Sequence, residues 1–199
     1  MERLPALHWP GRVLQSHPHQ HHRFDAPPRG PGAEMEISRG CPFRCEFCAK
    51  ETFRNRYRKR PLATVLEELD GLLAAGVEYV YFIDEIFMPD KELLELFRRR
   101  RFTFGVQMRM DLWDECMLQL LGEAGCVSIE TGVESISERG RRLLDKKIPI
   151  GFEELTRRLI VAKKHIPFVQ ANLVATECDD PEVVHLNGYA HGYLPWRAP

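Results

Sequence analysis

The sequence has no long hydrophobic run and almost no net charge. No apolar segment reaches about 18 residues, so we expect no transmembrane helix. The 28 basic and 29 acidic residues leave a formal net charge of −1, so no global field would attract nucleic acid or an acidic membrane. The amino-terminal residues lack the apolar core of a signal peptide, and we therefore expect a cytoplasmic protein.

The chain of 199 residues has six cysteines, too few for the dense disulfide framework of a small secreted domain. In the reducing cytoplasm these cysteines are expected to be free thiols or metal ligands, not a disulfide framework. Apolar residues make up 44% of the chain and charged residues 29%, the balance of an ordinary globular protein. The length suits one domain with a sizeable core.

Both ends of the chain lack the apolar periodicity of a core. Residues 1–32 are interrupted by prolines, so we expect an irregular arm or linker rich in histidine and proline. Its histidines at positions 17, 19, 21 and 22 allow a metal site, but we expect a solvated linker. Residues 183–199 hold scattered glycines and prolines, and we expect an irregular tail there.

Between these ends, residues 33–182 alternate β-rich runs with amphipathic helices. We expect strands over residues 33–38, 77–83, 102–109, 126–131 and 168–175. We expect helices over residues 62–73, 89–99, 137–146 and 152–165, and one capped by Asp111 that stops near Gly125. This alternation predicts an α/β fold with about five parallel strands, either part of a (β/α) barrel or an open doubly wound sheet.

Three cysteines stand close together directly after the first expected strand, in Cys41-Pro-Phe-Arg-Cys45-Glu-Phe-Cys48. Thiolates in one loop can face a single soft metal centre. A [4Fe–4S] cluster is normally held by four cysteines, and one held by three leaves an iron open to another ligand. An open coordination position is typical of a catalytic metal site. The alternative is a zinc site completed by a distant histidine or cysteine.

This triplet, with Phe47 before its third cysteine, resembles the signature of the radical S-adenosylmethionine (radical SAM) superfamily. The resemblance covers roughly residues 33–182 and implies a partial (β/α) barrel with the cluster at the carboxyl-terminal mouth of its strands. It also implies that Cys41, Cys45 and Cys48 hold a [4Fe–4S] cluster whose fourth iron is chelated by S-adenosylmethionine. Reductive cleavage would then release a 5′-deoxyadenosyl radical that takes hydrogen from a substrate.

Further segments resemble radical SAM proteins that carry a cobalamin-binding domain, many of which are methyltransferases. The similar segments are residues 33–41, 80–87, 129–135 and 169–173. The implied function is radical modification of a small organic substrate, methylation included. The sequence holds no Asp-x-His-x-x-Gly cobalamin motif, so we expect cobalamin to act only through a domain outside this chain. We expect the chain alone to be a fragment with little turnover.

Polar residues follow the expected strands, where parallel sheets gather their active sites. The resemblance implies that Asp84 and Glu85 contact the amino group of S-adenosylmethionine. Arg109 ends the third strand and suits a carboxylate. Glu130, Glu134 and Ser135 close the fourth strand, and in the resembling family Glu and Ser at this place lie near the ribose hydroxyls. Each residue also has a structural alternative. Asp84 and Glu85 could form a solvated acidic turn, Arg109 a strand-end ion pair, and Glu134 a charge at a helix N-terminus.

Three amides are weaker candidates for the same site: Gln107 on the third strand, and Gln170 and Asn172 on the fifth. The implied partners are a small-molecule substrate and a reductant such as flavodoxin or ferredoxin. The basic run over residues 53–60 suits a phosphate backbone, but we expect a solvated loop and no nucleic-acid partner. Two other functions stay open: an iron–sulfur or electron-transfer module without turnover, and a zinc-stabilised structural domain.

Overall fold

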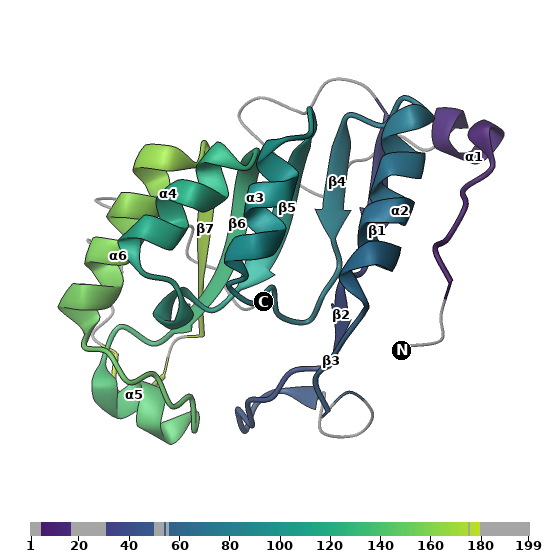
Figure 1. Cartoon of the computed structure of the whole chain (residues 1–199). Coiled ribbons are helices and arrows are strands. Elements are labelled where there is room, and N and C mark those ends of the chain that lie inside the picture. Colours follow the sequence, from purple (N-terminus) through teal and green to yellow (C-terminus); the bar gives the residue numbers. More distant parts are fainter. Residues whose placement is uncertain (1–4, 17–30, 50–53, 55, 175, 180–199) are drawn as a thin grey trace.

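A five-stranded parallel sheet forms the centre of the molecule (Figure 1). The computed structural model describes residues 5–16, 31–49, 54, 56–174 and 176–179. The strands are β1 (Gly32–Met35), β4 (Tyr79–Phe82), β5 (Thr103–Met108), β6 (Cys126–Glu134) and β7 (Phe168–Leu173), and they pair in this order. Because the order never reverses, the sheet is wound in one direction, as in a barrel wall, and not doubly wound.

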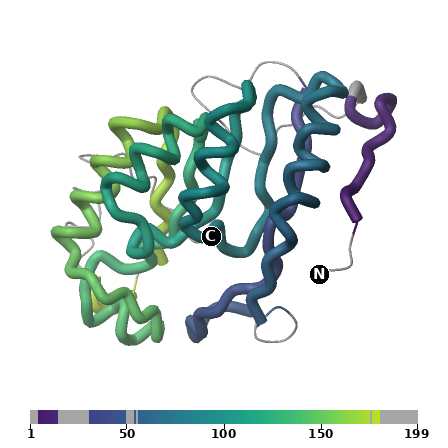
Figure 2. Tube along the Cα trace, viewed as in Figure 1, coloured from purple at the N-terminus to yellow at the C-terminus, as the bar shows by residue number. Residues whose placement is uncertain are grey.

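Helices cover one face of this sheet (Figures 1 and 2). They are α2 (Leu62–Ala74), α3 (Lys91–Arg98), α4 (Glu115–Glu123) and α6 (Phe152–His165). Pro61 precedes the first turn of α2, and the carboxylate of Asp90 accepts a hydrogen bond from Leu93 N at the start of α3. The expected α/β fold with a partial barrel is therefore confirmed.

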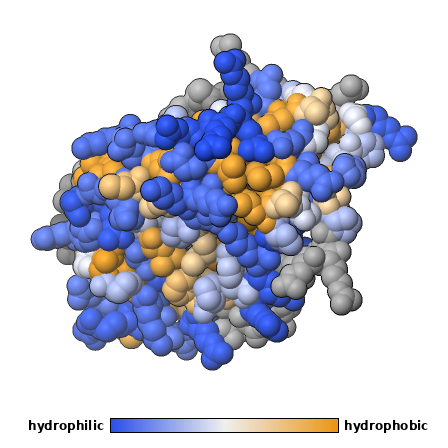
Figure 3. Space-filling view, viewed as in Figure 1, coloured by the Kyte–Doolittle hydropathy of each residue, from blue (hydrophilic) through white to orange (hydrophobic). Residues whose placement is uncertain are grey.

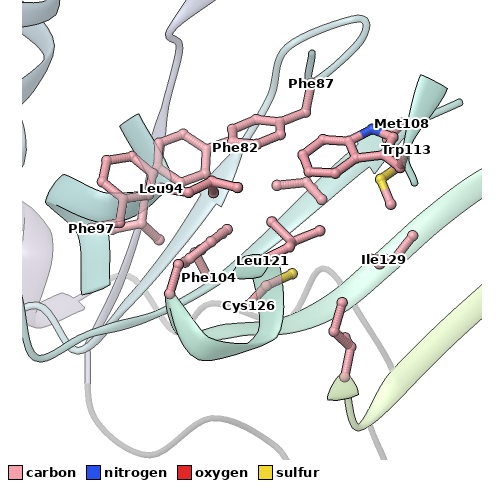
Figure 4. Packing of buried hydrophobic residues seen from close by; sticks show 14 of the residues in the cluster. Phe82, Phe87, Leu94, Phe97, Phe104, Met108, Trp113, Leu121, Cys126 and Ile129 are labelled. Carbon is pink, nitrogen blue, oxygen red and sulfur yellow. The ribbon is translucent and has the colours of Figure 1, made fainter. Parts of the chain in front are cut away.

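The hydrophobic core lies between the sheet and these helices (Figure 4). Alternate strand residues point toward the helices, which is why Phe82 and Phe104 meet Phe97 of α3 at ring-centroid distances of 5.4 Å. Trp113 stacks on Phe87 at 6.1 Å. Burial of each such side chain contributes about 1.5–3 kcal/mol to stability, so this core holds the helices against the sheet.

Smaller elements lie beyond the carboxyl ends of the strands, in the lower part of Figure 1. β2 (Ser38–Arg39) and β3 (Arg58–Lys59) form a short antiparallel ribbon, and α5 (Glu138–Leu143) follows β6. The expected strand over residues 33–38 is therefore divided, because β1 ends at Met35. Figure 3 shows that the helical side of the molecule is largely hydrophilic, with apolar patches between polar residues. No helix in the described part of the chain could span a membrane.

The expected helix cap at Asp111 is wrong. Asp114 caps α4 instead, and its carboxylate accepts from Met117 N at 2.8 Å. Asp111 lies in the 3-10 turn η2 (Met110–Leu112), and both its oxygens accept from the Arg109 guanidinium at 3.0 Å. The carboxylate is therefore already engaged by a stronger, charged donor.

The prediction that residues 1–32 are irregular is wrong in part. Residues Gly11–Ser16 form α1, whose Leu14 is buried in the core. Pro10 precedes the helix, and its carbonyl accepts from Val13 N, so this proline starts a regular element instead of interrupting one. The histidines at positions 17 to 22 and the expected tail over residues 183–199 lie outside the described residues.

Candidate functional site

A pocket of about 300 Å³ opens at the carboxyl ends of the strands. It is bounded by the cysteine loop, by the residues that follow β4, and by the ends of β5, β6 and β7. Its lining residues are Cys41, Phe43, Cys45, Phe47, Cys48, Glu85, Ile86, Gln107, Met108, Arg109, Glu130, Gly132, Glu134, Lys146 and Asn172. The structure thus brings most of the residues predicted from sequence into one cavity.

The cysteine loop needs a glycine immediately before it. Gly40 has a φ of +84°, and a Cβ on it would lie 2.2 Å from the Arg56 carbonyl oxygen. This close passage lets Cys41 N donate to the Arg54 carbonyl at 3.2 Å. The far side of the loop is tied to the end of α5, where Glu46 N donates to the Leu144 carbonyl at 3.3 Å. The loop is therefore fixed between two elements and faces the pocket.

Cys41, Cys45 and Cys48 are of intermediate exposure and line the same cavity. In the portions of the chain that the structure describes, no three cysteine, histidine or acidic side chains form a site for a single metal ion. A [4Fe–4S] cluster takes each thiolate on a different iron, so its ligands need to surround a cavity and not meet at a point. Three soft donors around one pocket fit such a cluster.

Arg109 is one of two cations beside these thiols. Its Nη1 donates to Sγ of Cys45 at 4.0 Å, and its guanidinium carbon lies 3.9 Å from the centre of the Phe43 ring. Its opposite edge is held by Asp111 and by the Lys147 carbonyl at 2.8 Å. Arg109 therefore lies in the pocket as expected, but its carboxylate partner in this structure belongs to the chain itself.

Lys146 is the second cation, and sequence reasoning missed it. Its Nζ donates to Glu134 Oε1 at 2.8 Å and to the Gly132 carbonyl at 2.7 Å. Only 5% of its side chain is exposed, against 84% for the adjacent Lys147. Two consecutive lysines carry no signal that separates them, so only the fold reveals which one lines the pocket. Burial raises the pKa of the Cys45 thiol, while Lys146 and Arg109 oppose that shift.

Glu85 lines the pocket, whereas Asp84 does not. Glu85 is ion-paired with Arg54 and accepts from Gly40 N at 2.6 Å, so it supports the cysteine loop. Asp84 is 1% exposed, and its oxygens accept from Ile37 N at 3.1 Å and from Ser38 N at 2.5 Å. Its carboxylate thus joins the end of β4 to the segment between β1 and β2.

Burial raises the pKa of Asp84 to about 6, although hydrogen bonds from Ser38 and Ile37 oppose the shift. An unfolded aspartate has a pKa of about 3.9, so between these values the folded chain binds more protons and stability falls as pH rises. Asp84→Asn removes this titration. From about pH 5 to pH 7 the wild type should lose roughly 1 kcal/mol more stability than the variant in urea unfolding. An equal change in both proteins would contradict this assignment.

Ser135 lies outside the pocket. Its hydroxyl is buried and donates to Asp179 Oδ1 at 2.6 Å, which fixes the turn before α5. Phe47 is at the rim, with 46% of its surface exposed. Of the weaker candidates, Gln107 and Asn172 line the cavity, while Gln170 donates to Asn172 Oδ1 at 2.7 Å. Glu130, beside Gln107 on the next strand, also lines it.

The chain is similar to curated proteins named as a methyltransferase and as methylthiotransferases. It is 29% identical over 126 residues to the uncharacterized methyltransferase PH0819 of Pyrococcus horikoshii, covering 59% of this chain and 28% of that protein. It is 41% identical over 56 residues to the ribosomal protein uS12 methylthiotransferase RimO of Cutibacterium acnes, covering 28% of this chain and 12% of that protein. The chain thus spans less than a third of the length of these relatives.

A solved structure has the same fold. The radical S-adenosylmethionine methyltransferase TsrM from Kitasatospora setae superposes with a TM-score of 0.68 at 24% identity, covering 85% of this chain and 37% of that one. Residues 35–183 match the sequence profile of the Radical SAM superfamily, a span that includes the last residue of β1 and all of β4, β5, β6 and β7. This protein therefore belongs to the radical SAM superfamily.

Proposed function

We propose that the chain is the core of a radical SAM enzyme that starts the radical modification of a small organic substrate. Members of the superfamily, methyltransferases and methylthiotransferases among them, are enzymes that use a [4Fe–4S] cluster and S-adenosylmethionine. The observation that carries the proposal is the convergence of Cys41, Cys45 and Cys48 on one pocket at the strand ends. When bound, the cluster would supply the electron that cleaves S-adenosylmethionine into methionine and a 5′-deoxyadenosyl radical.

The other pocket residues would bind and orient the remaining ligands. Phe47 presents an aromatic ring at the rim, suited to stacking on a base. Glu134 offers a carboxylate to hydroxyl or amino groups, and Lys146 holds that carboxylate in place. Gln107, Glu130 and Asn172 add polar groups on the wall farther along the sheet, where a substrate would lie.

Glu134→Gln should weaken the binding of S-adenosylmethionine by about 1–3 kcal/mol, because an amide replaces a charged acceptor in a buried site. Titration calorimetry of the reconstituted protein measures this change. Glu138→Gln is the matched control, since Glu138 is exposed and pairs only with Arg142 at 3.7 Å among described residues. Equal affinities of the wild type and Glu134→Gln would remove Glu134 from the binding site.

Anaerobic reconstitution with iron and sulfide tests the whole proposal. The expected result is about four irons per chain and a paramagnetic signal of the reduced cluster that changes when S-adenosylmethionine is added. A paramagnetic signal that does not change when S-adenosylmethionine is added would favour an electron-transfer module without turnover. Zinc in place of iron in the purified protein, with no iron taken up, would favour the structural domain.

We also propose that the modification is a methylation. It is supported by the relatives named as methyltransferases, and TsrM has been solved with both cobalamin and a [4Fe–4S] cluster bound. Cobalamin would reach this pocket only from a further domain. We assign the role of electron donor to flavodoxin or ferredoxin and place the reaction in the cytoplasm, where the six cysteines would stay reduced.

A further inference from the structure

We propose that Arg109 and Lys146 set the reduction potential of the cluster from the side of Cys45. The inference rests on the proposed function, because it assumes that Cys45 is a cluster ligand. It assigns Lys146 a task beyond holding Glu134, and it gives Arg109 a task that does not need a substrate carboxylate. Arg109 acts on the cluster through its ligand Cys45 and Lys146 acts through its charge, so both are positioning residues and not catalytic residues.

Arg109 is oriented so that one nitrogen faces sulfur and the others face anions. Nη1 points to Sγ of Cys45, whereas Nε and Nη2 donate to the two oxygens of Asp111, each at 3.0 Å. The Phe43 ring covers the guanidinium at 3.9 Å, and Nη2 also donates to the Lys147 carbonyl. With three sides fixed, the N–H on Nη1 cannot turn away from the thiolate.

Lys146 adds a second buried cation to the same wall of the pocket. Two oxygens hold its Nζ, from Glu134 and from the Gly132 carbonyl. Glu134 cancels much of its charge over a distance, just as Asp111 does for Arg109. The hydrogen bond to sulfur is directional and is not cancelled in this way, so Arg109 should have the larger effect.

Reduction transfers one electron from a low-potential donor to the cluster, with no proton and no bond broken. The step adds one negative charge to a site that already carries three thiolates. Hydrogen bonds to the cluster sulfurs, nearby charge and burial are the factors that set such potentials. A donor to Cys45 and a cation beside it stabilise the more negative state, so both raise the potential.

A redox titration of the reconstituted chain, followed by the paramagnetic signal of the reduced cluster, tests this proposal. Arg109→Gln should make reduction at least tenfold less favourable, a fall of about 59 mV in the midpoint for one electron. The double variant Lys146→Gln/Glu134→Gln removes the cation without leaving a buried carboxylate unpaired, and should lower the midpoint by less. Lys147→Gln, whose side chain is 84% exposed, is the matched control and should match the wild type.

Arg109→Lys keeps the charge but loses the planar fork, so its midpoint should fall between those of the wild type and Arg109→Gln. The midpoint of Arg109→Lys also tests the inference if the Arg109→Gln protein loses its iron. Midpoints equal to wild type in the Arg109 variants and in the double variant, with iron content preserved, would overturn the inference alone. A wild-type chain that takes up no iron would instead overturn the proposed function.

Discussion

Replacing Cys45 with alanine is expected to abolish the iron–sulfur cluster. Cys45 lies between Cys41 and Cys48 in the loop that borders the pocket, and all three thiols line it. Three thiolates are already one fewer than such a cluster normally has, so the loss of any of them leaves two irons without a protein ligand. Iron and sulfide per chain should fall from about four to near zero, together with the visible absorbance of the cluster.

The other cysteines provide matched controls. Cys116 is exposed on α4, and Cys178 lies after β7, so neither borders the pocket. Cys116→Ala and Cys178→Ala should bind as much iron as the wild type. If either control variant lost as much iron as Cys45→Ala, the assignment of Cys41, Cys45 and Cys48 as the cluster ligands would be wrong. Cys126 is a poorer control, because it is buried in the core and its replacement would leave a cavity.

The order of strands and helices could be predicted from the sequence because each element carries its own periodic pattern. The apolar stripe of α2 and the β-branched and aromatic run of β4 are local signals. The position of the cysteine loop follows from the same logic, since residues after a parallel strand gather at one edge of the sheet. The family resemblance places the same loop at the strand ends.

The pairing of charged side chains could not be predicted in this way. Asp84 and Glu85 are adjacent, yet Asp84 turns toward Ser38 while Glu85 borders the pocket. Asp111 and Asp114 are equally suitable as helix caps by residue type. Asp114 caps α4 because the carboxylate of Asp111 is bound by Arg109. These pairings depend on side chains that only the fold brings together, so no local sequence pattern predicts them.

The amino-terminal segment is a further example. Its prolines predict an irregular arm, yet the segment contacts the domain through a residue about sixty positions away. Leu7 N donates a hydrogen bond to Glu68 Oε2 at 3.0 Å. Glu68 also pairs with Arg60 at 2.5 Å, and Arg60 donates to the Glu36 carbonyl at 2.6 Å. This buried pair therefore joins α2, the end of the β3 ribbon and residues 5–7.

Glu68→Gln should destabilise the fold by about 3–5 kcal/mol, because it leaves the Arg60 charge buried without its carboxylate. The side chains of Arg60 and Glu68 are only 4% and 1% exposed, so water cannot compensate for the loss. The free energy of unfolding in urea measures the effect. Glu67→Gln, one position away on the exposed face of α2, is the matched control and should change stability by less than about 0.5 kcal/mol.

A second variant separates the charge from the packing. Arg60→Met/Glu68→Leu replaces both partners with apolar groups of similar length. It should recover part of the stability lost in Glu68→Gln, although Leu7 N and the Glu36 carbonyl lose their side-chain partners. Recovery is expected because the cost of the single variant comes from an unpaired charge and not from the loss of attraction. A Glu68→Gln protein as stable as Glu67→Gln would show that Arg60 finds another partner, and that residues 5–7 are not held by this pair.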